Sequence, residues 1–501
     1  MRIEAATAPG ALVAGGCWPA PKLTLGLLTP WLGSQWCKPH SQTREAITDS
    51  ASTRPSRVAA SAGGLSAESP CVWLNSRHHA SRPSSGAMRG RALDSPRALR
   101  HGQSSGKQRG ETVRTIDAAT KEASPSTVRA GSSWWLLLVV FIPSVVRAPF
   151  SLDVSEYHAY AMAFLAHPGM SWPLEYPPTA ILPMLPAAVP LVFAFAMASV
   201  GAVLYGVLRQ SDPPAARTWL LGCALGGIFI LCTRFDIVPS LLVVLALLAA
   251  ERGRWSRAWA WTAAAAALQW FGAVLGPLWL VAEWRATGRW RWDRAVAAGG
   301  AVLASYGLAA LGTGAHAFSS ILWYVHRPVE IESLAATVGA VTGPLHLSHA
   351  FGSWNVLGPQ MPAIRLVLVM AQIGGQGALW VRYSQGRCTL REATALSVTW
   401  LVLAGTLFSP QYLLWMLPLW ALADWRPRWL VLLVCVLTTA DYPFAFAILH
   451  TQAGVLLVAS ARNSALLALV GVVGGWRLRP GQSLAASGTA GRAVVADPAP
   501  E

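Results

Sequence analysis

Hydrophobic residues are distributed very unevenly along this chain. Up to about residue 130 no apolar periodicity persists, and Ser, Arg, Gly and Ala dominate, as in residues 81–86. From about Trp134 onward, long apolar stretches alternate with short polar hinges that carry arginine. About 20 apolar residues make a membrane-spanning helix, and fewer suffice where helices tilt or pack on neighbours. The pattern therefore predicts an all-α, multi-pass membrane bundle that follows a disordered segment.

We expect about twelve spans on this length scale. Their approximate ranges are 133–150, 180–208, 218–233, 237–250, 257–270, 271–284, 295–314, 361–381, 393–408, 411–423, 429–447 and 463–476. Two adjacent pairs, 257–284 and 393–423, are short enough to be partly re-entrant. The predicted organisation is a basic segment (1–130), a membrane domain (131–480) and a disordered C-terminal tail (481–501).

The composition agrees with a membrane protein. Only 12% of the residues are charged and 53% are hydrophobic, whereas a soluble protein has about 25% charged residues. Much of the net charge of +16 belongs to residues 1–130, which hold 17 Lys and Arg against 8 Asp and Glu. This segment lacks a folded nucleic-acid-binding motif, so we interpret it as a solvated tail and predict no nucleic-acid partner. A later translation start, at Met88, is an alternative.

The seven cysteines are scattered, at positions 17, 37, 71, 223, 232, 388 and 435. None forms a CxxC pair, and no His and Cys spacing suits zinc. Three lie inside apolar stretches, where Cys usually packs as a small hydrophobic residue. We therefore predict no structural disulfide, no metal site and no cofactor.

The arginines after residue 130 indicate the orientation, because Lys and Arg accumulate in cytoplasmic loops. With the N-terminus inside, 17 of them fall in inner hinges. The five on the outer side are Arg147, Arg234, Arg327, Arg365 and Arg462. Both termini are therefore predicted to be cytoplasmic, in a multi-pass protein of the cell membrane.

The same orientation places the two longest loops, roughly 151–179 and 315–360, on the outer side. Seven acidic residues lie there with them. Long, polar, aromatic-rich loops on one face of a bundle are where binding and catalytic residues concentrate. The slightly acidic outer face is therefore the predicted functional face, and the short inner hinges suit topology and lipid-headgroup contacts.

The first outer loop begins with two carboxylates just after the first span. Asp153 lies nearer the span end than Glu156, and a carboxylate held there can take a proton from an attacking hydroxyl. A solvated loop acid is an equally weighted alternative.

Further along, Glu175 and Tyr176 are candidates to line a sugar site. The two prolines after them have the structural role of starting the second span.

Arg234 and Asp236 lie in a tight turn between the third and fourth spans. An ionised group at the edge of a bilayer is costly unless it is paired or faces a polar cavity. We favour a structural ion pair between these two residues, with a position in a polar cavity as the alternative.

The second long loop carries His326, Arg327 and Glu332 among several Trp and Tyr residues. The planar fork of Arg matches phosphate oxygens, and a neighbouring His can add a donor or exchange a proton. A single Trp is more typical of an interfacial belt, but the cluster favours a site.

Gln411 and Tyr412 follow a proline-broken helix. Such breaks occur where the backbone lines a cavity or is covered by protein, and a purely structural break is equally favoured.

Taken in order, these residues resemble glycosyltransferase family 87, the polyprenyl-phosphate-mannose-dependent mannosyltransferases of the GT-C fold. The resemblance extends over about 133–480. It rests on Asp153 with Tyr157, and on the segments 175–178, 234–236, 326–333, 352–355 and 409–412.

The resemblance implies inverting transfer of a sugar, with mannose expected, from a lipid-phosphate donor to an acceptor hydroxyl on the outer side. It also implies that Asp153 is the catalytic base and that His326 and Arg327 lie near the donor phosphate. Glu156, Glu175, Tyr176, Arg234, Asp236, Glu332, Gln411 and Tyr412 complete the expected substrate-binding set. The chain departs from many relatives at 268–271, where Gln269 stands in a turn that commonly carries Lys.

Two alternatives stay open. A lipid-linked glycan ligase or polymerase would work on the same side with a different donor. A transporter or flippase would place ionisable residues near the midplane and use inverted repeats, and neither a clear repeat nor charges within most spans are seen. The expected partners are a polyprenyl-phosphate sugar donor, a glycolipid or glycan acceptor and the lipid bilayer.

Overall fold

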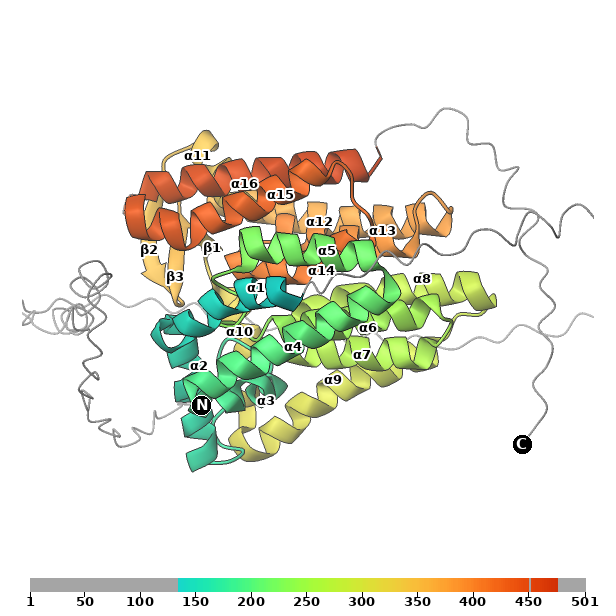
Figure 1. Cartoon of the computed structure of the whole chain (residues 1–501), viewed down its shortest axis with the longest axis horizontal. Helices are drawn as coiled ribbons and strands as arrows, with labels where there is room; N and C mark the ends of the chain where they lie inside the picture. Colours follow the sequence, from blue (N-terminus) through green and yellow to red (C-terminus); the bar gives the residue numbers. More distant parts are fainter. Residues whose placement is uncertain (1–133, 450–451, 476–501) are drawn as a thin grey trace, which may run out of the picture. The chain divides into compact units, whose positions relative to one another are not determined.

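The computed structural model describes residues 134–449 and 452–475, and most of them are helical (Figure 1). The helices are α1 (Trp134–Arg147), α2 (Leu152–Ala166), α3 (Ile181–Met184), α4 (Pro190–Ser211), α5 (Pro213–Gly222), α6 (Ile237–Glu251), α7 (Trp255–Leu268), α8 (Leu275–Thr287), α9 (Trp292–Thr313), α10 (Ser319–His326), α11 (Leu334–Thr342), α12 (Met361–Ser384), α13 (Leu390–Leu403), α14 (Leu413–Leu422), α15 (Arg428–Thr439) and α16 (Gln452–Val473). The basic segment 1–130 and the tail 481–501 lie outside the described residues.

Each of the twelve expected spans overlaps a helix, but the helices differ from the expected ranges in length. Within the described residues, four are long and apolar enough to cross a membrane: Pro190–Ser211, Trp292–His326, Met361–Ser384 and Ala453–Val473. A fifth candidate is the bent pair Leu137–Phe150 and Leu152–Ala166, whose halves meet at 62°. The membrane character of the bundle is thus supported, and the count of twelve stays a prediction.

The side chains on the long helices support a lipid environment. Only 6% of the apolar window of α12 and 17% of that of the segment Trp292–His326, which contains α9 and α10, are buried inside the protein. Leu311 of α9 is 85% exposed and Val367 of α12 is 65% exposed. A soluble monomer rarely exposes contiguous apolar surface on this scale, so these faces are suited to acyl chains.

Six shorter helices form the interior of the bundle. Helices α5, α6, α7, α8, α13 and α14 have 10 to 15 residues. At 1.5 Å per residue they are about 15 to 22 Å long, less than the ~30 Å of a hydrocarbon core. The turns that join α5 to α6, α7 to α8 and α13 to α14 are buried in the bundle, as the low exposure of Phe235, Gln269 and Phe408 shows.

The connections of the bundle separate into two ends (Figure 1). At one end lie α2, α10, α11 and the strands. The loops between α6 and α7, α8 and α9, and α12 and α13 lie at the other. There Arg391 pairs with Glu251 at 2.7 Å and with Asp212 at 3.2 Å, and Arg285 donates to the Tyr383 carbonyl. The arginine-rich hinges thus gather at one end, as expected from the sequence.

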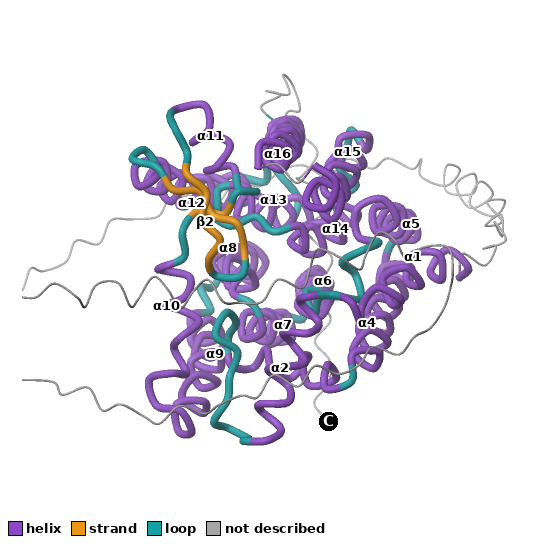
Figure 2. The backbone as a smooth tube through the Cα atoms, turned by 90° about the vertical axis from the view of Figure 1, so that its left-hand side faces the viewer, coloured by secondary structure: helices purple, strands orange, loops and turns teal. Residues whose placement is uncertain are grey.

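A small antiparallel sheet departs from the all-α expectation. Strands β1 (Val329–Glu330), β2 (His346–Ala350) and β3 (Ser353–Leu357) pair in the order β1-β3-β2. Figure 2 looks onto this end, with the strands near the viewer. Only two residues, Phe351 and Gly352, join β2 to β3, with φ of 56° and 70°. Two positive φ values are the geometry of a tight hairpin turn whose twist matches the strands.

Candidate active site

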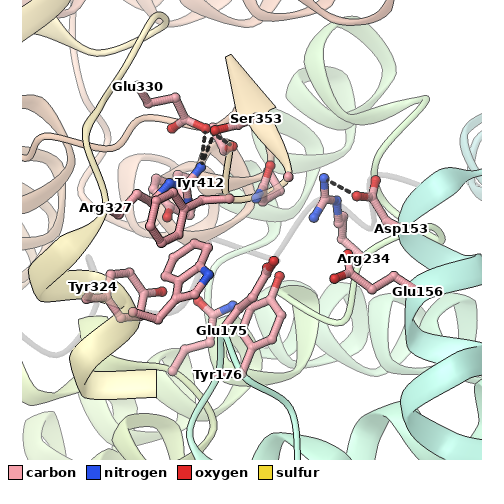
Figure 3. Close-up of a pocket in the computed structure, with 16 residues that line it drawn as sticks. Asp153, Glu156, Glu175, Tyr176, Arg234, Tyr324, Arg327, Glu330, Ser353 and Tyr412 are labelled. Carbon is pink, nitrogen blue, oxygen red and sulfur yellow. Dashed lines mark hydrogen bonds and ion pairs between the residues drawn. The ribbon is translucent and has the colours of Figure 1, made fainter. Parts of the chain in front are cut away.

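A polar pocket opens at the end of the bundle that carries the sheet. Its residues come from α2, the loop before α3, the α5–α6, α7–α8 and α13–α14 turns, α10, β1 and the β2–β3 hairpin. They are Asp153, Glu156, Glu175, Tyr176, Arg234, Gln269, Trp323, Tyr324, Arg327, Glu330, Phe351, Gly352, Ser353, Ser409, Gln411 and Tyr412. Figure 3 shows ten of these side chains labelled around the opening.

One wall of the pocket is an ion pair between Asp153 and Arg234. Asp153 stands in the first turn of α2, where the helix dipole favours a negative charge. Arg234 Nη2 lies 2.6 Å from Asp153 Oδ1, and the two side chains are 16% and 17% exposed. Arg234 also donates to the Tyr157 hydroxyl at 3.5 Å. Asp153 lines the pocket, so its carboxylate can face a molecule bound there.

Two further carboxyls, Glu156 and Glu175, lie close together beside this wall. Glu156 follows Asp153 by three residues, which places both on one face of α2, and Tyr160 donates to Glu156 Oε1 at 3.3 Å. Burial, reinforced by the negative charge of Asp153, raises the pKa of Glu156 above its usual range. Burial and the neighbouring carboxylates likewise raise the pKa of Glu175 to about 8, although Arg327 and Arg234 oppose them. Glu175 is therefore mainly protonated at neutral pH.

The raised pKa of Glu175 predicts a pH-dependent stability. Between about pH 4.5 and 8 the unfolded chain has released this proton and the folded protein keeps it, so stability falls as pH rises through this window. Glu175→Gln stays neutral and should remove up to about 1.4 kcal/mol per pH unit of that slope. Unfolding midpoints measured in detergent at several pH values test this.

A suitable control is Glu251→Gln at the opposite end of the bundle, which should keep the wild-type slope. If the Glu175→Gln and wild-type midpoints run parallel from pH 5 to 8, Glu175 does not hold the proton.

The opposite wall of the pocket is built around Arg327. Its Nη2 donates to Glu330 Oε1 at 2.9 Å and to Ser353 Oγ at 2.7 Å. Its guanidinium lies over the Trp323 ring, 4.4 Å from the centroid. The Nε of Arg327 is buried and has no hydrogen-bond partner among the described residues. Because a buried donor is normally satisfied, this nitrogen favours an anionic ligand.

Glu330 connects the Arg327 wall to the α13–α14 turn. It is 2% exposed, and besides Arg327 its carboxylate accepts from Phe408 N at 2.9 Å and Ser409 Oγ at 3.1 Å. Its own amide donates to the Thr406 carbonyl at 3.0 Å. These bonds are all internal, so Glu330 orients Arg327 and is not free to move protons.

The floor of the pocket comes from the interior turns of the bundle. Gln269 and Trp415 both donate to Asp236 Oδ1, at 3.2 Å and 2.8 Å. Trp415 stacks on Tyr412 with ring centroids 3.9 Å apart. Asp236 is fully buried, and burial raises its pKa to about 6 even though Arg234 opposes the shift. Asp236 therefore supports the floor and does not line the opening.

The structure brings together eight of the eleven residues expected at the site. Asp153, Glu156, Glu175, Tyr176, Arg234, Arg327, Gln411 and Tyr412 line the pocket. The expected ion pair between Arg234 and Asp236 is replaced by the one between Arg234 and Asp153, because Asp236 points into the floor.

His326 and Glu332 lie away from the pocket. His326 is exposed, and its Nδ1 is bonded to the Leu322 carbonyl at 2.7 Å. Glu332 is 4% exposed and adjoins a buried ion pair in which Arg462 Nη1 meets Asp441 Oδ2 at 2.7 Å. Arg462 also donates to the Glu332 carbonyl at 2.8 Å. In this structure the Glu332 side chain belongs to a buried cluster of charged groups with Asp441 and Arg462.

Eight pocket residues were not among the expected ligands. They are Gln269, Trp323, Tyr324, Glu330, Phe351, Gly352, Ser353 and Ser409. Four of them, Trp323, Tyr324, Glu330 and Ser409, lie within three residues of an expected one, and Gln269 marks the turn where the chain departs from many relatives. Among the described residues, no group of three or more His, Cys, Asp or Glu side chains is placed to hold a metal ion.

Most of the pocket residues lie in a segment that matches a known protein family. The model of glycosyltransferase family 87 matches residues 174–410. This range holds all the pocket residues except Asp153 and Glu156 on its N-terminal side and Gln411 and Tyr412 just beyond it. Over this range the chain is similar to a family of glycosyltransferases, and its long apolar helices suit a membrane protein. No curated protein matches the chain at a significant level.

Proposed function

We propose that this protein transfers a sugar, mannose in the first instance, from a polyprenyl-phosphate donor to an acceptor hydroxyl on the outer side of the cell membrane. The observation that carries the proposal is the arrangement of the pocket walls. Asp153 lies on one side of the opening and Arg327 on the other, with Glu175 between them (Figure 3).

Opposed walls suit an inverting displacement. The acceptor oxygen attacks the anomeric carbon of the sugar while its proton passes to the Asp153 carboxylate. The bond from the anomeric carbon to the phosphate oxygen breaks on the opposite face, and its electron pair stays with the departing polyprenyl phosphate. Arg327 is placed to stabilise that charge, because its buried Nε has no partner within the described part of the chain.

The charge of the pocket is compatible with a phosphate once protonation is considered. Four carboxyls and two arginines line it. Glu330 is paired with Arg327 and Asp153 with Arg234, and Glu175 is mainly protonated at neutral pH because of its raised pKa. A neutral Glu175 also carries a hydroxyl proton that can be donated to a sugar oxygen.

The depth of the floor supports a lipid-linked donor. The turns that carry Gln269 and Gln411 join helices of only 10 to 14 residues, so the pocket is recessed into the bundle. A polyprenyl chain can reach such a pocket laterally from the bilayer. The arginine-rich loops at the opposite end favour a cytoplasmic position for that end and for both termini.

Transfer in liposomes tests the proposed function. Purified protein is supplied with labelled polyprenyl-phosphate mannose and a membrane extract as acceptor, and the product is identified by mass spectrometry. We expect release of polyprenyl phosphate together with one new hexose on the acceptor. Transfer only from an oligosaccharyl donor would indicate a glycan ligase, and movement of labelled lipid between leaflets without transfer would indicate a flippase.

A further inference from the structure

A second pocket lies at the end of the bundle opposite the candidate active site. It is formed where α7 and α9 begin and where α8 ends. Its lining is Gly253, Arg254, Trp255, Ser256, Arg257, Glu283, Thr287, Arg291 and Arg294. Four of these nine residues are arginines, so the pocket is strongly basic.

The carboxylates at this pocket do not neutralise all of its arginines. Glu283 is 1% exposed; one carboxylate oxygen pairs with Arg294 and the other accepts from Trp259 Nε1 at 3.0 Å. Asp293 pairs with Arg291 at 2.8 Å from the exposed side. Among the described residues, Arg254 and Arg257 have no carboxylate partner. Two guanidinium charges are thus uncompensated beside the pocket.

The helix ends add to this excess of positive charge. Arg254 is the N-cap of α7 and Arg291 is the N-cap of α9, and neither helix start has a side-chain cap. Most helices begin with Ser, Thr, Asp or Asn, which satisfy the free amides and suit the positive end of the dipole. At the start of α9, Asp293 in the first turn supplies a negative charge and pairs with Arg291. The first turn of α7 has no acidic residue, so Arg254 beside the positive end of that helix is unfavourable unless an anion joins it.

Aromatic side chains mark the surroundings of this pocket. Trp284, Trp290 and Trp292 stack in a row with ring centroids 5.1 Å and 6.1 Å apart. They are 36%, 48% and 59% exposed. They adjoin the pocket residues Glu283 and Arg291 in the sequence. Exposed Trp rows of this kind are typical of the level of the lipid headgroups.

We propose that this basic pocket binds the phosphate group of an anionic membrane lipid. Arg254 and Arg257 take the phosphate oxygens, and the Trp row lies along the glycerol and the start of the acyl chains. The phosphate neutralises the positive charge that Glu283 and Asp293 do not neutralise. This site is separate from the transferase pocket and does not depend on the proposed reaction.

Lipid binding to the purified full-length protein tests the proposal. Native mass spectrometry measures the apparent Kd for the first molecule of phosphatidylglycerol or phosphatidylcholine. We expect phosphatidylglycerol to bind the more tightly, and Arg254→Gln/Arg257→Gln to weaken it about 30-fold, since each basic residue near a headgroup contributes ~1 kcal/mol. Both arginines are exposed, so the variant should fold normally, as the unfolding midpoint without added lipid will show.

A matched control carries the same loss of charge at the same end of the bundle. Arg217→Gln/Arg387→Gln removes two exposed arginines outside the pocket and should keep wild-type phosphatidylglycerol binding. Equal binding by the two double variants would overturn the proposal. A site that binds inorganic phosphate but not phosphatidylglycerol, and loses the phosphate in the Arg254→Gln/Arg257→Gln variant, would overturn the lipid assignment.

Discussion

Asp153→Asn should lower the rate of sugar transfer by about 10²- to 10⁴-fold, the usual contribution of a positioned general base. Asparagine has nearly the same shape and still accepts a hydrogen bond from Arg234, but it cannot take the proton of the acceptor hydroxyl. The measurement is the initial rate of transfer from labelled polyprenyl-phosphate mannose by protein in liposomes, with the unfolding midpoint recorded in parallel.

A matched control separates loss of the base from loss of an ion pair. Asp424 pairs with Arg428 at 2.6 Å and Arg426 at 3.0 Å in the loop between α14 and α15, so Asp424→Asn also removes a carboxylate that faces arginine. Its transfer rate should stay within about twofold of the wild type, since exposed ion pairs contribute little. A wild-type rate in Asp153→Asn would rule out the base. If Arg234→Gln lost as much activity as Asp153→Asn, the Asp153 carboxylate would act only by holding Arg234.

The helical framework follows from the sequence because a membrane imposes a simple constraint. Every backbone polar group must be satisfied inside the bilayer, so each apolar stretch predicts a helix. All twelve expected stretches overlap helices. Sequence reasoning could not set their true lengths, because α7, α8, α13 and α14 stop at turns whose positions depend on packing around Asp236 and Glu330.

The site was only partly predictable for a related reason. Asp153, Arg234 and Arg327 are charged residues beside apolar spans, and their cost in the bilayer marks them in the sequence. No comparable signal shows which carboxylate pairs with Arg234. Asp236 is two residues away along the chain, whereas Asp153 is 81 residues away and is brought near only by the packing of α2 on the bundle.

The sequence did not predict the sheet, because its strands are short and their pairing is non-local. β1 has two residues, and its pairing with β3 is non-local. The hairpin turn contains Phe351 at a positive φ, a conformation that favours Gly or Asn. This turn carries Ser353 to Arg327, so an unusual backbone conformation lies at the site where function is proposed. In the sequence His326 and Arg327 were equivalent candidates. They are consecutive residues at the end of α10, so their side chains point in different directions, and only Arg327 lines the pocket.

Arg327→Lys should lower kcat for transfer by about 10²-fold and raise the KM for the donor by a smaller factor. The donor is a phosphodiester with one negative charge, and the departing polyprenyl phosphate gains a second one. A group that faces this phosphate therefore stabilises the transition state more than the bound donor. Lysine keeps the charge but loses the planar fork that reaches Glu330, Ser353 and the phosphate together.

Two variants show whether this loss reflects the phosphate contact or the support of the fold. Among the described residues, Arg365 donates only to the carbonyls of Val325 and Arg327, at 3.1 Å and 3.5 Å. Arg365→Lys therefore makes the same chemical change beside the pocket and should lower kcat only a few-fold. In Arg327→Gln/Glu330→Gln neither buried charge is left unpaired, which should restore most of the stability that Arg327→Gln loses. Its activity should stay as low as that of Arg327→Gln. Recovery of transfer in the double variant would mean that Arg327 serves the pocket only by neutralising Glu330.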